Sequence, residues 1–121
     1  MANPNIVNVS TITGRSEGSA LGTSSSDIVT NSASSGQIYK VNSILIANVD
    51  GTNSADATVK FYNADNTTSY SIVSTITIPA DASLEVLGKN TQIYLEEGDK
   101  ITGLASASGD LEIIVSYEVI S

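Results

Sequence analysis

The chain has neither cysteine nor histidine among its 121 residues. Without cysteine it has no disulfide framework, no thiolate metal ligand and no cysteine nucleophile. Without histidine it lacks the commonest general base, a common zinc ligand and the usual pH switch, so a Ser-His-Asp triad is impossible. These two absences exclude most familiar catalytic centres, and they favour a protein that is not an enzyme.

Basic residues are scarce, and the charge balance is strongly acidic. The chain carries 5 Lys and Arg against 13 Asp and Glu, which gives a net charge of −8 at pH 7. Proteins that bind nucleic acid or an anionic membrane surface need clustered Lys and Arg. We therefore expect neither nucleic acid nor a membrane as a partner, and we expect self-repulsion to keep a free subunit soluble.

Aromatic residues make up only 5% of the chain, and no apolar run is long enough to cross a membrane. The segment from Met1 to Asn5 has no basic region and no apolar core behind it, so we expect no targeting signal. A chain of this length corresponds to one domain. We predict a single domain over residues 1–121, in which residues 1–35 include an extended N-terminal strand or arm.

The residues that are abundant favour β-structure. Val, Ile and Thr recur throughout, and no segment shows the 3.6-residue period of an amphipathic helix. Short strands separated by frequent turn formers are typical of sandwiches and barrels. The sequence therefore predicts an all-β, single-domain sandwich of about eight strands, with jelly-roll or immunoglobulin-like topology. The turn formers are Gly14, Gly18, Gly22, Gly36, Asp50-Gly51, Asp65-Asn66, Pro79-Ala80-Asp81, Gly88, Gly98-Asp99 and Gly109-Asp110.

Residues 37–49 form the longest apolar run, and it is apolar on both faces. The odd-numbered residues, from Tyr39 to Val49, form the predicted core face, with Ile38, Ile44 and Ile46 opposite. Sandwich strands normally present polar residues to solvent. The second apolar face therefore indicates either contact with another subunit or a central strand covered by loops.

The C-terminal strand repeats this pattern. Its odd-numbered residues, from Leu111 to Val119, form the predicted core face, and Ile114 and Ile120 lie opposite. Of the five tyrosines, Tyr39 and Tyr117 fall on predicted core faces, and the others are candidates for exposed contacts. The predicted interface residues are Ile38, Ile44, Ile46, Tyr62, Tyr94, Ile114 and Ile120.

Three segments contain residue types that can support chemistry. The carboxylates of Glu96, Glu97 and Asp99 fall within one tight turn, which favours solvated surface charges over a catalytic pair. The segment 50–56 is rich in oxygen ligands but lacks the spacing of an EF-hand, so a loop of turn formers is favoured over a calcium site. The glycines between residues 14 and 22 lack the Gly-Lys-Ser/Thr ending of a phosphate loop. We predict no catalytic, cofactor or metal site.

Several segments together resemble small structural proteins of tailed-phage virions, notably those of marine and cyanobacterial phages. The resemblance extends from about Ser35 to the C-terminus, and its motifs are strand cores and turns. The segments that carry it are Ser35–Ile44, Ile46–Gly51, Thr75–Leu84, Ile93–Ile101 and Val115–Glu118.

The resemblance implies a capsid decoration or cement protein. Such a protein would bind the phage major capsid protein on the outer capsid surface and reinforce the contacts between capsid subunits. It would be made in the cytoplasm of the host bacterium and would form a homo-oligomer, with a trimer favoured over a dimer. A tail, neck or fibre component involved in host attachment is the alternative.

Overall fold

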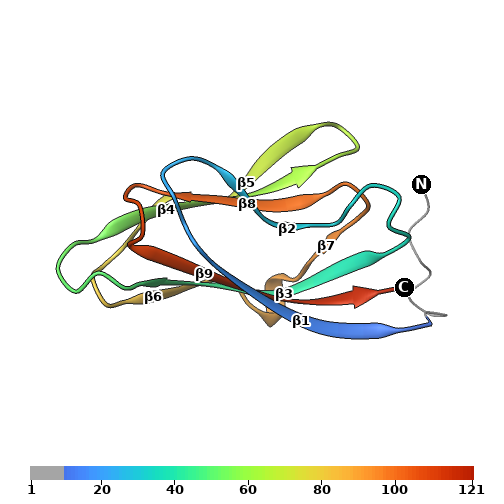
Figure 1. The fold of residues 1–121 in the computed structure, drawn as a ribbon, viewed down its shortest axis with the longest axis horizontal. Helices are drawn as coiled ribbons and strands as arrows, with labels where there is room; N and C mark the ends of the chain where they lie inside the picture. The colour runs from blue at the N-terminus through green and yellow to red at the C-terminus, as the bar shows by residue number, and fades with distance from the viewer. Residues whose placement is uncertain (1–9) are drawn as a thin grey trace.

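The computed structural model describes residues 10–121, which form two antiparallel sheets packed face to face (Figure 1). One sheet has the strand order β1-β9-β3-β6, with β7 also paired to β3, and the other has the order β2-β8-β4-β5. The predicted all-β sandwich is therefore confirmed. The elements are β1 (Ile12–Ala20), β2 (Ser26–Thr30), β3 (Ile38–Asn48), β4 (Ala55–Asn63), β5 (Thr68–Ile78), β6 (Ser83–Leu87), the 3₁₀ turn η1 (Lys89–Thr91), β7 (Ile93–Leu95), β8 (Lys100–Ala105) and β9 (Leu111–Ile120).

The connections decide between the two predicted topologies. Among the described strands, the chain passes from one sheet to the other at every connection except those from β4 to β5 and from β6 to β7. In an immunoglobulin-like sandwich, several of these consecutive pairs would be neighbours within one sheet. Crossing at most connections is the arrangement of a jelly roll.

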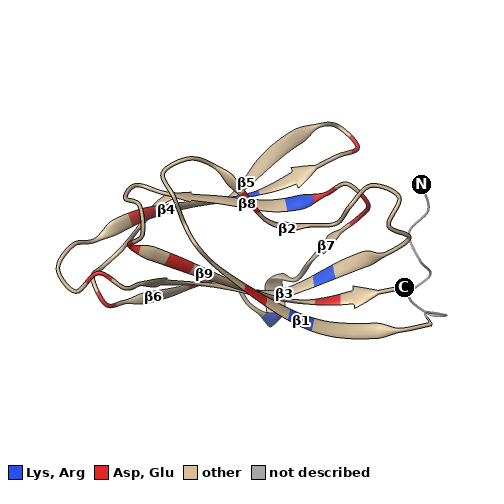
Figure 2. Cartoon of the chain, viewed as in Figure 1, with Lys and Arg blue, Asp and Glu red and all other residues tan. Residues whose placement is uncertain are grey.

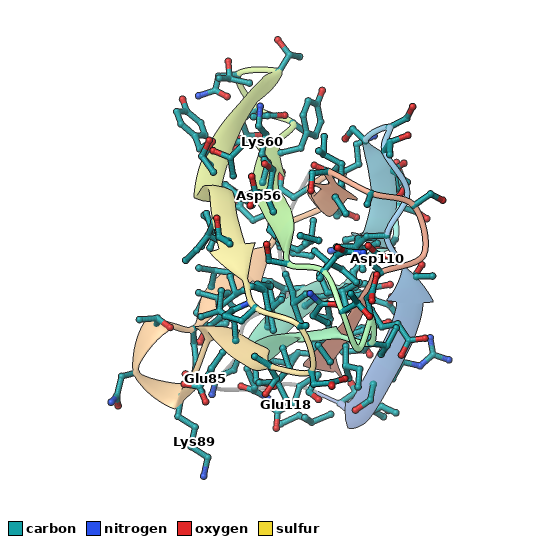
Figure 3. All side chains as sticks on the ribbon, turned by 90° about the vertical axis from the view of Figure 1, so that its left-hand side faces the viewer. Asp56, Lys60, Glu85, Lys89, Asp110 and Glu118 are labelled. Carbon is teal, nitrogen blue, oxygen red and sulfur yellow. The ribbon has the colours of Figure 1, made fainter. Side chains whose placement is uncertain are left out.

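The core lies between the two sheets and is mainly aliphatic. Side chains fill the space between the layers, whereas Lys89 projects away from the molecule (Figure 3). Tyr117 is buried at the edge of this core and stacks on Tyr39, with ring centroids 5.1 Å apart. The largest fully buried side chains are Leu21, Val29, Val41, Ile44, Ile46, Val59, Ile78, Leu95, Ile101, Leu111, Ile113 and Val115.

A β-bulge after Val41 changes which face of β3 packs on the core. Before the bulge the odd-numbered residues point inward, and after it the even-numbered residues do, because one extra residue moves every later side chain to the other face. Ile44 and Ile46 are fully buried, so the prediction that they lie opposite the core is wrong. Leu45 and Val49, predicted to be core residues, are 41% and 50% exposed.

Ile38 and Ile120 are also buried, although they are not part of the central core cluster. They face each other across β3 and β9, and Ile12 of β1 faces Ile120 on the other side. Cross-strand neighbours on one face lie within contact distance and cover part of each other. Only 8% of Ile38 and 5% of Ile120 is exposed, so neither offers the free surface predicted for it.

The Ser/Thr-rich N-terminal part contains two strands. From residue 10 onward, the predicted strand or arm of residues 1–35 forms β1 and β2, and residues 1–9 lie outside the described part of the chain. The glycine-containing segment considered as a phosphate loop lies in and just after β1. No helix in residues 10–121 is long and apolar enough to span a membrane.

Candidate functional site

The carboxylates between β7 and β8 hold loops together. Asp99 is 4% exposed, and its Oδ1 and Oδ2 accept the backbone N–H groups of Ala64 and Glu96 at 2.9 and 3.0 Å. Oε2 of Glu97, which is 8% exposed, accepts the N–H of Gly36 at 2.6 Å. The prediction of solvated charges is therefore wrong for Asp99 and Glu97, because both serve as acceptors for backbone donors.

The second oxygen of Glu97, Oε1, is buried and has no hydrogen-bond partner among the described residues. Buried polar atoms are nearly always paired, and an unpaired one costs about 1–3 kcal/mol. Within residues 10–121, no group of three or more His, Cys, Asp and Glu side chains could hold a metal ion. Glu97 is therefore a structural carboxylate with one oxygen paired and the other unpaired.

Asn31 fixes the loop after β2 from a fully buried position. Its Nδ2 donates to the carbonyl oxygens of Gln37 and Leu95, both at 2.9 Å, and its Oδ1 accepts the Ser35 hydroxyl at 2.6 Å. Sequence reasoning missed this residue. Its place at the end of a short β-prone segment was the only local signal, and its partner Leu95 is remote in sequence.

Asn48, at the end of β3, plays a similar part. It is 3% exposed, and its Nδ2 donates to the carbonyl oxygens of Asn53 and Ile78 at 3.0 and 2.9 Å. Its Oδ1 accepts the N–H of Asp50 at 2.9 Å. An amide side chain suits this position because it donates and accepts at once.

The segment 50–56, considered as a calcium loop, uses the carboxylate of Asp50 in local hydrogen bonds and that of Asp56 in a bond from β4 to β5. Oδ1 of Asp50 accepts the N–H groups of Thr52 and Asn53 at 2.8 and 3.2 Å, and these bonds lower the pKa of Asp50. Oδ1 of Asp56 accepts the Thr77 hydroxyl at 2.7 Å. This geometry favours the turn interpretation of the segment.

The outer face of the β1-β9-β3-β6 sheet carries an exposed apolar pair. Leu45 and Ile114 are direct neighbours across β3 and β9, and they are 41% and 47% exposed. Gly18 faces Ile114 from β1, and a surface hollow lined by residues 18–20 and 112–114 adjoins the pair. Ile114 was among the predicted interface residues, whereas Leu45 was missed because the bulge reversed the face of β3.

The two predicted interface tyrosines lie elsewhere. Tyr94 of β7 is 42% exposed. Tyr62 of β4 is half-buried, and the Lys100 ammonium lies 5.2 Å from the centre of its ring. Of the seven predicted interface residues, the structure therefore brings only Ile114 into an exposed apolar pair.

The strand β1 is exposed along its whole length. It carries one basic and one acidic residue, Arg15 and Glu17, which lie close together on the strand (Figure 2). The Tyr117 hydroxyl donates to Oε1 of Glu17 at 2.9 Å. Burial, together with this hydrogen bond and the charge of Glu17, raises the pKa of Tyr117 to about 12.

No protein-family model matches the chain, and no curated protein matches it. A solved structure of a Bacillus endospore appendage, described as a member of a novel family of disulfide-linked pili, is similar in fold. The similarity has a TM-score of 0.54 at 16% sequence identity and covers 99% of this chain and 96% of that chain. The likeness therefore concerns the whole sandwich, and at this identity it shows the fold alone.

Proposed function

We propose that the chain is a non-enzymatic structural subunit that associates with copies of itself in a larger assembly. The observation that carries this proposal is the likeness, over 99% of the chain, to an appendage structure described as a pilus. The buried carboxylates and amides support it too, because Asp99, Glu97, Asn31 and Asn48 each form at least one hydrogen bond to the chain's own backbone.

The contacts in such an assembly cannot be disulfides. The pili formed by the similar structure are described as disulfide-linked, but this chain has no cysteine. Association would depend on burial of apolar surface, backbone hydrogen bonds at sheet edges and pairs of opposite charges. The exposed pair Leu45 and Ile114 is the first apolar candidate for such a contact.

The sequence resemblance supports a phage virion as the assembly, with this chain as a decoration protein on the outer capsid. Each copy would bridge neighbouring major capsid subunits and bury roughly 800 Å² on each partner, a typical size for a stable contact. A ligand that binds only the assembled lattice stabilises that lattice by mass action. The likeness to a filamentous appendage supports the alternative, a tail, neck or fibre component.

Cryo-electron microscopy of purified phage particles tests where this chain lies on the virion. A decoration protein is expected in hundreds of copies across the shell, each touching more than one capsid subunit. A few copies at the neck, tail or fibres would refute decoration in favour of the alternative. Absence from the particles would refute a virion role.

A further inference from the structure

The strand β1 is a sheet edge that is open to another strand. Within residues 10–121 it stands at the end of its sheet and pairs only with β9, and all of its nine residues are exposed. Its register against β9 runs without a break from Ile12 to Ala20. A long, regular edge of this kind is a ready template for pairing with another chain, and β1 contains neither Pro nor Lys to prevent it.

The other three sheet edges are protected by the usual devices. The strand β2 has only five residues and a bulge. The strand β5 has two shifts in its register against β4, and Thr75 within it has a positive φ of 47°. On the remaining edge, β3 is paired with two short strands, β6 and β7. Among the described strands, β1 is therefore the edge best suited to pairing.

The hydrogen bonds between β1 and β9 show which backbone groups are free. Just before β1, Thr11 exchanges two backbone hydrogen bonds of 3.0 Å with Ser121, and just after it the N–H of Leu21 donates to Leu111. Since hydrogen-bonded pairs alternate along antiparallel strands, the odd-numbered residues of β1 bond to β9. The N–H and C=O groups of the even-numbered residues, from Ile12 to Ala20, therefore point to the open edge.

The sequence of β1 is self-complementary about Ser16. We infer that β1 pairs antiparallel with β1 of a second copy, around a two-fold axis that passes between the two Ser16 residues. This inference rests on the proposed self-association and names one two-fold contact within it, which by itself joins two copies. Arg15 would lie opposite the partner's Glu17, and Gly14 opposite the partner's Gly18. Each even-numbered residue of β1 would then face an even-numbered residue of the partner strand, and each such pair would exchange backbone hydrogen bonds. This pairing uses the N–H and C=O groups that point to the open edge.

The two charges select this register over its neighbours. Free backbone groups meet only if the register shifts by an even number of residues. The nearest shift in one direction sets Arg15 against the partner's Arg15, and the nearest shift in the other sets Glu17 against the partner's Glu17. Like charges directly opposite each other on paired strands are destabilising, whereas opposite charges are favourable. This charge complementarity identifies a second copy of the chain as the occupant of the edge.

Charge exchange tests this contact. The association constants of the full chain and of the variants R15E, E17R and R15E/E17R are measured by sedimentation equilibrium at low salt, where charge effects are least screened. Each single exchange creates two like-charge pairs in place of two opposite ones, so we expect the dissociation constant to rise about tenfold or more. The double exchange restores the opposite pairs, so it should associate within about threefold of the wild-type chain.

A second variant separates this contact from damage to the fold. Gly14→Pro removes an N–H that points to the open edge, a Cβ at Gly14 meets nothing within 4 Å, and the β1–β9 hydrogen bonds stay. Gly14→Pro should therefore weaken association. The thermal unfolding of the chain, in which β1 unfolds together with the other strands, should be the same as in the wild-type chain. If the wild-type chain associates and neither the charge exchanges nor Gly14→Pro alters its affinity, the β1 contact is refuted while the proposed function stands. A wild-type chain that stays monomeric at every concentration refutes both.

Discussion

Replacing Asp99 with Asn tests whether the β7–β8 turn holds the neighbouring loops as described. Both carboxylate oxygens of Asp99 accept backbone N–H groups, from Ala64 and from Glu96, in a site that is 4% exposed. The amide has the same shape, but its NH₂ group must face one of these donors. One charge-assisted hydrogen bond is lost, and the N–H group that it satisfied is left part-buried without this partner.

The expected cost follows from these contacts. A hydrogen bond to a charged group contributes about 1.5–3 kcal/mol, and the second bond weakens when the charge is removed. We expect Asp99→Asn to lower the free energy of unfolding by about 2–3 kcal/mol. For a chain of this size, a loss of this magnitude corresponds to a fall in Tm of roughly 6–12 °C.

Glu97→Gln is the matched control in the same turn. The amide oxygen can still accept the Gly36 N–H, and the NH₂ group replaces Oε1, which has no partner to lose. We therefore expect a change below about 1 kcal/mol. Urea unfolding followed by far-ultraviolet circular dichroism measures both variants at pH 7. Equal costs for the two substitutions, or a larger cost for Glu97→Gln, would refute the assignment of their roles.

Three further predictions test separate parts of the structure. The raised pKa of Tyr117 predicts a tyrosinate absorbance step at about pH 12 that Tyr117→Phe removes. In the unfolded chain the pKa of this tyrosine is 10.0, so its contribution to the free energy of unfolding is complete below pH 10 and is lost as the pH rises through about 12. Asn31→Ala removes three side-chain hydrogen bonds at a fully buried site and should cost about 3 kcal/mol in urea unfolding; a cost below about 1 kcal/mol would contradict its bracing role. Ile44→Ala should cost about 2–5 kcal/mol and Ile114→Ala less than about 1 kcal/mol, and the reverse order would contradict the bulge in β3.

Regular alternation made the C-terminal strand readable from the sequence. Leu111, Ile113, Val115 and Tyr117 are buried, and Ile114 is exposed, as the period of two predicted. The strand β3 was misread because a single bulge reverses its faces, and nothing in an apolar run marks where the extra residue falls. The fold class was therefore predictable, but the faces of the bulged strand β3 were not.

The buried polar groups were not predictable because their partners are remote in sequence. The side chain of Asn31 reaches the Leu95 carbonyl, and that of Asp99 reaches the Ala64 N–H. A turn such as Glu96–Asp99 reads as solvated when it is considered alone. The sequence also did not predict that β1 is an open edge strand. Its glycines and serines have low strand propensity, and its position at a sheet edge depends on the topology of the whole fold.

The mass of the purified chain in solution tests the central claim most directly. Static light scattering on the full chain over a wide concentration range reports the average mass, for comparison with the 12.5 kDa of one copy. A non-covalent structural subunit is expected to form species larger than one copy that grow with concentration and are unaffected by a thiol reductant, since the chain has no cysteine. A single species of 12.5 kDa at every concentration would contradict the account.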